Sequence, residues 1–354
     1  MSNQIDQYLR QLIANDGSDL HLIAGQPPRT RVYGEIRPIE SDILTPDHAR
    51  DMFLEIMDDK ARHEFDKRDA TDFAYNIEGL ARFRVNVMRH LGGMGAVLRA
   101  IPATARSLNE LNMPPAVMRL SKEPQGLILV TGKTGSGKST TLAAMIDAIN
   151  DRMHGHILTI EDPIEFVHAR KNCLISQREI GQHTGSFGDA LHSALREDPD
   201  VILVGEMRDL ETISIAVTAA EMGILVMGTL HTNGAAQTVD RIVNVFPTDK
   251  QSHVRTMLST SLRGVVSQQL VPRKDGKGLV AALEVLINNS ATANLIRQGK
   301  LDQLETAMQS GRRSGMCTMD STLKDLMDKA TISGQSAYEA ANDKSKFELV
   351  KDQT

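Results

Sequence analysis

Apolar residues in the first sixty positions follow two different periods, which predict a small α+β arrangement. Apolar side chains over residues 5–13 recur at helical spacing, and a glycine then breaks the pattern before a predicted strand over 19–23. Alternation over 31–36 predicts a second strand. Thr45, followed by Pro and Asp, is typical of the start of a helix, here expected to run to about Met57. We therefore expect the order helix, strand, strand, helix.

Alternating positions continue to about residue 101. Residues 73–87 alternate on either side of Glu78-Gly79 and predict an antiparallel pair, and a strand over 96–101 follows a glycine-rich turn. Residues 102–115 mix small residues with one short apolar piece, which is typical of a boundary between domains. The pattern predicts an N-terminal domain over 1–101 and a linker over 102–115.

A different architecture begins at about residue 116. Short continuous apolar runs are typical of strands buried on both faces of a parallel sheet, and they occur here at 127–130, 157–160, 201–204 and 224–227. Segments of helical period lie between these runs. Alternating strands and helices predict an α/β domain over 116–290, and a polar helical pattern predicts a C-terminal helical region over 291–354.

Length and composition agree with two domains and exclude several classes of protein. The chain has 354 residues, a little over two domains of roughly 150 residues each. Its two cysteines, Cys173 and Cys317, lie far apart, so neither a disulfide framework nor a four-cysteine zinc site can form. No stretch reaches the ~18 consecutive apolar residues of a membrane span, and the N-terminus does not match a signal peptide. These features predict a cytoplasmic protein without a transmembrane segment.

The most specific motif is a glycine-rich phosphate loop placed between a buried strand and a helix. It reads Gly132-Lys133-Thr134-Gly135-Ser136-Gly137-Lys138-Ser139-Thr140. Its glycines let successive backbone N–H groups face phosphate oxygens, assisted by the positive end of the following helix. In such loops the lysine, here Lys138, reaches the β and γ phosphates, and the hydroxyl, here Ser139, ligates Mg²⁺. The sequence therefore predicts binding of ATP and Mg²⁺.

Candidate groups for hydrolysis follow three other predicted strands. Glu165 lies in an acidic segment after the 157–160 run, and Glu206 follows the 201–204 run, with Gly205 where an aspartate is usual. We favour Glu165 as the general base and Glu206 as the ligand of Mg²⁺ through water, although the sequence alone leaves the two roles open. His231 follows the 224–227 run and is a candidate γ-phosphate sensor; a purely structural histidine is the alternative.

These segments together resemble one known family. The phosphate loop, residues 160–166, residues 196–206 and residues 228–233 occur in the order found in the secretion ATPase superfamily, and they are most similar to its type IV pilus retraction ATPases. The resemblance implies a PAS-like N-terminal domain and a RecA-like ATPase domain that assemble as a homohexameric ring. It also makes Arg82, Arg84 and Arg99 candidates to approach the nucleotide from the N-terminal domain, with a charged outer sheet face as the alternative.

The resemblance also implies partners and a place in the cell. A retraction ATPase acts at the cytoplasmic face of the inner membrane, at the pilus base, on a platform protein, and a paralogous retraction ATPase is a further partner. Residues 291–298 depart from the family pattern at three positions, whereas residues 315–320 look more like the principal motor. The principal motor of twitching motility is thus the leading interpretation, and an accessory paralogue is the alternative.

Two functions of other classes stay open at this point. A nucleic-acid translocase also uses a RecA-like ring, but the net charge of -5 and the aromatic content of 3% without tryptophan count against nucleic acid as a partner. A scaffold that binds nucleotide without hydrolysing it would keep the phosphate loop. Glu165 and Glu206 count against that scaffold, because hydrolysis needs acidic groups at such positions.

Overall fold

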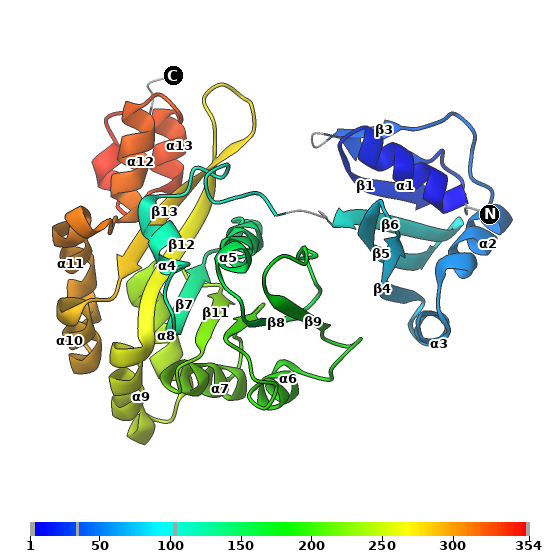
Figure 1. The fold of residues 1–354 in the computed structure, drawn as a ribbon. Helices are drawn as coiled ribbons and strands as arrows, with labels where there is room; N and C mark the ends of the chain where they lie inside the picture. The colour runs from blue at the N-terminus through cyan, green and yellow to red at the C-terminus, as the bar shows by residue number, and fades with distance from the viewer. Residues whose placement is uncertain (1–3, 33–34, 102–104, 352–354) are drawn as a thin grey trace. The chain divides into compact units, whose positions relative to one another are not determined.

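An antiparallel six-stranded sheet forms the N-terminal unit in the computed structural model, which describes residues 4–32, 35–101 and 105–351 (Figure 1). The elements in chain order are α1 (Gln4–Ala14), β1 (Gly17–Ile23), β2 (Arg29–Val32), β3 (Glu35–Pro38), α2 (Pro46–Ile56), α3 (Asp59–Arg68), β4 (Ala70–Ile77), β5 (Ala81–His90) and β6 (Gly93–Ile101). The sheet order is β3-β2-β1-β6-β5-β4. Apolar side chains of α1, α2 and α3 pack on one face of the sheet, and Phe53 and Phe83 are among the largest fully buried ones.

The sequence prediction for this unit is correct for most elements, wrong for one, and did not include α3. The helix expected after Thr45 is α2, and the threonine side chain caps it by accepting the N–H of His48. The single strand expected over 31–36 is instead parts of two strands, β2 and β3, in which Val32 pairs with Glu35. Residues 33 and 34 lie outside the described ranges. Alternation alone cannot separate one strand from two short strands that pair with each other.

The second unit contains a sheet with helices on both faces. Its elements are α4 (Pro115–Leu120), β7 (Gly126–Thr131), α5 (Lys138–Arg152), β8 (His156–Glu161), β9 (Leu174–Glu179), α6 (Phe187–Ala194), β10 (Val201–Val204), α7 (Leu210–Glu221), β11 (Leu225–Leu230), α8 (Ala235–Val245), α9 (Thr248–Ser261), β12 (Leu262–Pro272) and β13 (Leu279–Ile287). Among the described residues the sheet has the order β13-β12-β7-β11-β10-β8-β9, in which only β13 pairs antiparallel. The α/β prediction is confirmed.

Burial explains why the four predicted apolar runs form the centre of this sheet. Every residue of β7 and β10 is buried, because α4 and α5 cover one face while α6 to α9 cover the other. Alternate side chains of each strand enter one of the two cores: Leu127 and Leu129 face the α7 side, and Ile128 and Val130 face the α5 side. The parallel arrangement brings the carboxyl ends of β7, β11, β10 and β8 to one edge.

The C-terminal region is helical and attaches to the last two strands. It contains α10 (Ser290–Gln298), α11 (Leu304–Ser310), α12 (Met319–Asp328) and α13 (Gly334–Ala340), with short 3-10 turns between and after them. Helices α12 and α13 form a separate core with the outer parts of β12 and β13, built around Val271, Ala282 and Leu323 (Figure 1). Within the described ranges, no helix combines the length and the apolar character needed to cross a bilayer.

Contacts divide the chain into residues 1–104 with 165–167, and residues 105–164 with 168–354. In the first of these units an ion pair joins neighbouring strands β1 and β6. Asp19 is 4% exposed and accepts hydrogen bonds from Ser18 Oγ at 2.7 Å and from Arg99 Nε at 2.7 Å. Burial acts to raise the pKa of Asp19, but these hydrogen bonds and the charge of Arg99 outweigh it and lower the pKa.

We expect Asp19→Asn to lower the free energy of unfolding at neutral pH by about 1–2 kcal/mol, because a buried carboxylate loses charge-assisted hydrogen bonds. The folded-state pKa lies below the ordinary value of 3.8, so this stabilisation is present above that value and is lost as the pH falls through the folded pKa. Urea unfolding of both proteins between about pH 7 and about pH 3 checks the prediction. A stability difference that stays constant over this range would contradict it.

Candidate nucleotide-binding site

The phosphate loop connects β7 to α5, and its glycines are required by its close packing against β12. Gly132 has φ +141° and Gly137 has φ +86°, conformations that favour glycine. A Cβ atom on Gly132 would lie 2.3 Å from the carbonyl oxygen of Gln268, and one on Gly137 would lie 2.7 Å from the Nε2 atom of the same residue. The loop can curl closely against β12 because Gly132 and Gly137 carry no side chains.

Several polar groups of the loop fit a bound phosphate chain. Lys138 is 9% exposed, and its ammonium donates to the carbonyl oxygens of Gly132 at 2.9 Å and Lys133 at 3.0 Å. The hydroxyls of Thr131 and Ser136 are buried and have no hydrogen-bond partner among the described residues. Helix α5 begins without a side-chain cap, so its first N–H groups remain available to an anion. Unpartnered buried hydroxyls and an uncapped helix start are the features expected where phosphate oxygens bind.

Gln268 is a site residue that the sequence did not reveal. It lies in the interior of β12, is 2% exposed, and accepts a hydrogen bond from Thr141 Oγ1 of α5 at 2.7 Å. This bond fastens the first turns of α5 to the strand against which the phosphate loop packs. The separation of 127 positions explains why no local motif connects the two residues. The local signal was weak, because β12 also carries Arg263, Ser267 and Gln269 and does not have the pattern of an apolar strand.

Glu206 and His231 come together at the same sheet edge, as predicted from their positions after β10 and β11. The Nε2 atom of His231 lies 3.2 Å from Glu206 Oε1. Arg208, which the sequence analysis passed over, is also paired with Glu206: its Nε lies 2.5 Å from Oε1 and its Nη2 lies 2.5 Å from Oε2. A basic residue two positions after a candidate metal-binding acid was the available sequence signal.

Arg208 and His231 control the ionisation of Glu206. Burial acts to raise the pKa of this carboxyl, but the hydrogen bond and charge of Arg208, together with the His231 ring, outweigh burial and lower the pKa. The Glu206 side chain is 18% exposed, so these interactions are partly shielded from water. The group is therefore held as an anion, the form that can bind Mg²⁺ or its water.

Crowding explains the glycine that replaces the usual aspartate before Glu206. A Cβ atom on Gly205 would lie 3.1 Å from the carbonyl oxygen of Ile160 and 3.2 Å from Glu161 Cα, closer than side chains ordinarily pack. The Gly205 N–H donates to that same carbonyl oxygen at 2.7 Å, and its carbonyl oxygen accepts the hydroxyl of Thr229. Close contact between the ends of β10, β8 and β11 thus favours a residue without a side chain at this position.

Two acids of the segment after the 157–160 run fall in different units of the chain. Glu161 ends β8, is 8% exposed and accepts a hydrogen bond from Thr159 Oγ1 at 2.7 Å. Glu165 lies in the segment between β8 and β9, and residues 165–167 group with the N-terminal unit. The role of Glu165 as general base stays a prediction.

The three candidate arginines lie on one face of the N-terminal sheet. Arg84 of β5 pairs in register with Arg99 of β6, and Arg82 lies two residues before Arg84, on the same face of β5. Each of two neighbouring carboxylates holds one of them: Arg84 Nε is 3.8 Å from Asp72 Oδ1, and Arg99 Nε is 2.7 Å from Asp19 Oδ1. The strands place the guanidinium groups together, and their approach to a nucleotide stays a prediction.

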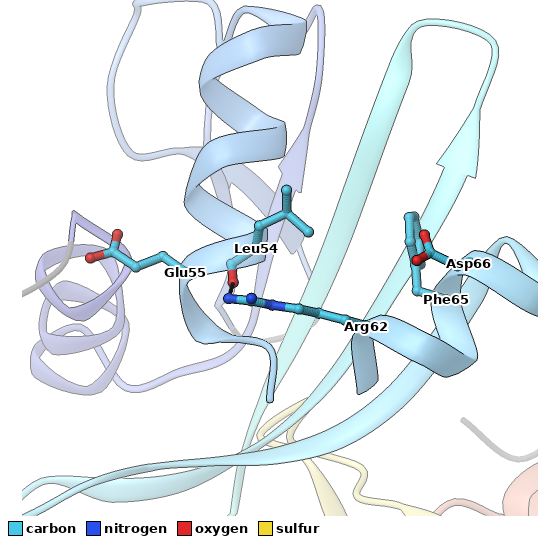
Figure 2. Close-up of a pocket in the computed structure, with 5 residues that line it drawn as sticks. All are labelled: Leu54, Glu55, Arg62, Phe65 and Asp66. Atoms are coloured by element: carbon cyan, nitrogen blue, oxygen red, sulfur yellow. Dashed lines mark hydrogen bonds between the residues drawn. The ribbon is translucent and has the colours of Figure 1, made fainter. Parts of the chain in front are cut away.

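A separate pocket of about 440 Å³ lies between α2 and α3 of the N-terminal unit. Figure 2 shows its lining residues Leu54, Glu55, Arg62, Phe65 and Asp66, with Arg62 Nη2 donating to the carbonyl oxygen of Leu54 at 2.7 Å. The pocket contains none of the candidate residues named from the sequence. Its lining also carries two carboxylates, which would disfavour phosphate.

Comparisons with known proteins agree with this geometry. A family model described as "Type II/IV secretion system protein" matches residues 1–349. The type IV pilus retractation ATPase PilT of Pseudomonas aeruginosa is 53% identical over 324 residues, which cover 92% of this chain and 94% of that protein. The type IV pilus ATPase PilU of the same organism is 40% identical over 343 residues, which cover 96% of this chain and 90% of PilU. A crystal structure of the pilus retraction motor PilT with bound ADP is similar, with a TM-score of 0.92 and 45% identity. The match covers 98% of this chain and 100% of that one.

The loop geometry predicts different effects for two glycine substitutions. Gly132→Ala should weaken binding of a fluorescent ADP analogue by roughly tenfold or more, because its Cβ would overlap the Gln268 carbonyl oxygen. Gly135→Ala is the matched control: Gly135 also has a positive φ, +79°, but a Cβ there meets no atom of a described residue within 4 Å. We expect a smaller loss for this control. Equal losses in the two variants would show that packing against β12 does not shape the loop.

Proposed function

The chain belongs to the family of type II/IV secretion system proteins, and from this premise we propose that it is the ATP-hydrolysing motor that powers type IV pilus retraction and twitching motility. One observation carries the proposal: a complete phosphate loop and the Glu206–His231 pair lie at one sheet edge, in a chain that matches a retraction ATPase over nearly its full length. The accessory paralogue is less favoured, because the identity to PilU is lower than the identity to PilT.

In this proposal the phosphate loop binds ATP together with Mg²⁺. Lys138 would exchange its carbonyl contacts for the β and γ phosphates, the Ser139 hydroxyl would ligate Mg²⁺, and Glu206 would hold the ion through water. When bound, Mg²⁺ would supply positive charge that offsets the negative charge on the phosphates. His231 acts as the γ-phosphate sensor, since it contacts the same carboxylate oxygen that would respond to Mg²⁺. Glu165 is the proposed general base that accepts the proton of the attacking water.

Work on the pilus requires an assembly, which we propose is a homohexameric ring. Arg82, Arg84 and Arg99 from the N-terminal sheet would complete the nucleotide sites, because a planar guanidinium stabilises the charge on the γ-phosphate and reports its loss. The ring would act on a platform protein at the cytoplasmic face of the inner membrane, at the pilus base. A paralogous retraction ATPase is a further candidate partner.

A nucleic-acid translocase is a weaker candidate. The net charge of -5 and the absence of tryptophan give little basis for binding to phosphate backbones or for base stacking. Salt-sensitive stimulation of turnover by single-stranded DNA would favour that function over pilus retraction.

The proposed ring motor predicts that turnover depends on assembly. Phosphate release per chain should rise as protein concentration increases and light scattering detects a hexamer, because the arginines would complete each site across subunits. Lys138→Ala should remain folded and lose turnover, since it removes the ammonium that contacts the β and γ phosphates. Circular dichroism provides the control for folding. Equal turnover by a monomer would contradict the ring mechanism, and normal turnover by Lys138→Ala would contradict the site itself.

The roles of the two acids predict opposite effects on binding and turnover. Glu165→Gln should leave nucleotide affinity unchanged and lower turnover by roughly a hundredfold or more, the range expected for loss of a general base. Glu206→Gln should weaken the Mg²⁺ dependence of nucleotide binding, measured by titrating a fluorescent ADP analogue at rising Mg²⁺. The reverse pattern would assign the base to Glu206 and the metal contact to Glu165.

A further inference from the structure

Glu284 of β13 is a buried carboxylate that joins the first residues of two helices. It is 5% exposed; its Oε1 accepts the N–H of Ala235 at 2.8 Å, and its Oε2 accepts the N–H of Met319 at 3.2 Å. Ala235 begins α8 and Met319 begins α12. Carboxylates at helix starts stabilise the unpaired N–H groups there, so one side chain satisfies both helices at once.

The α8 contact reaches directly to the turn that carries His231. Only Thr232, Asn233 and Gly234 separate His231 from α8. Gly234 has φ +96°, and a Cβ atom there would lie 3.1 Å from Glu284 Oε1, so glycine allows the carboxylate to approach. The Gly234 N–H donates to Ser267 Oγ at 2.8 Å, and Ser267 is the register partner of Glu284 on β12. Two paired strand residues therefore hold this turn.

The α12 contact is equally well defined. Cys317 forms a bridge to Val285, with backbone hydrogen bonds of 2.9 and 3.1 Å, and Thr322 Oγ1 donates to the carbonyl oxygen of Leu283 at 2.7 Å. The backbone of β13 thus holds the start of α12 on both sides of Glu284. The Met319 N–H contact is the link through which a displacement of the Glu284 carboxylate would reach the first turn of α12.

We propose that Glu284 is a positioning residue that couples the His231 turn to the C-terminal helix α12. When the nucleotide changes the position of His231, the N–H of Ala235 moves with the turn and displaces one oxygen of the Glu284 carboxylate. The other oxygen carries this displacement to Met319. This inference rests on the proposed function, because it requires His231 to respond to the γ-phosphate.

The test compares hydrogen exchange in the full-length protein bound to ADP with exchange in the protein bound to a non-hydrolysable ATP analogue. In the unmodified protein, exchange should differ between the two nucleotides at residues 231–238 and also at 317–322. In Glu284→Gln the amide offers one acceptor and turns an NH₂ group toward the other N–H. The response at 231–238 should remain and the response at 317–322 should disappear, while kcat falls by roughly tenfold at nearly unchanged nucleotide affinity.

Glu284→Asp provides a second variant in case the glutamine protein does not fold. It keeps the charge and both oxygens, but its shorter side chain cannot reach both N–H groups. We expect the same separation of the two responses. If both segments of either folded variant still respond together, the proposed coupling is wrong.

Asp320→Asn is the matched control for loss of a buried acid in the same region. Asp320 is 7% exposed and accepts the N–H groups of Asn342 at 2.9 Å and Asp343 at 3.2 Å, and it pairs with Lys346 Nζ at 3.0 Å. Asp320 holds the chain after α13, whereas the hydrogen bond to the first residue of α8 is made by Glu284. The control should therefore keep both responses.

If the two responses also separate in Asp320→Asn, loosening α12 alone would be enough to uncouple residues 317–322 from residues 231–238. That result would overturn the role of Glu284. His231→Ala distinguishes this failure from failure of the proposed function. Unchanged exchange at 231–238 and unchanged turnover in that variant would contradict the sensor role. A lost response in His231→Ala beside an intact coupled response in Glu284→Gln would contradict only the present inference.

Discussion

Close approach between the phosphate loop and β12 is the constraint on which the site depends. A Cβ atom at Gly132 would lie 2.3 Å from a backbone oxygen of Gln268, so the loop can follow this path only without side chains at its contact points. The same glutamine accepts the Thr141 hydroxyl, which fastens α5 to that strand. The loop and its helix both pack against β12, so their N–H groups and Lys138 are in place before any phosphate binds. Little conformational entropy is then lost when the phosphate binds.

The second edge of the site is organised by charge. Glu206 is held as an anion by Arg208 and His231, and both of these contact its Oε1 atom. In the proposed function, a metal held at Glu206 would compete with these two contacts, so metal binding and the position of His231 would be linked through one oxygen atom. Such a link would let a histidine follow the state of the phosphates without itself transferring a proton.

The sequence allowed prediction of features that depend on neighbouring residues. The phosphate loop, the buried strands and the positions of Glu206 and His231 after their strands all follow from short segments whose pattern is complete in itself. Strand β9 was not predicted, because it lies at the sheet edge and its polar sequence does not match a strand buried on both faces. Gln268 and Glu284 were not predicted either. Their roles come from contacts with residues 127 and 49 positions away, which no local pattern records.

Strand β12 shows how one element can serve the whole unit. Consecutive strand residues point to opposite faces, so Ser267 reaches the turn before α8 while Gln268 reaches α5. Buried polar side chains are costly unless they are hydrogen-bonded, and here each bond joins a different helical layer to the same strand. The strand then continues with β13 into the part covered by α12 and α13. The phosphate loop, the His231 turn and the C-terminal helices are therefore attached to one pair of hydrogen-bonded strands.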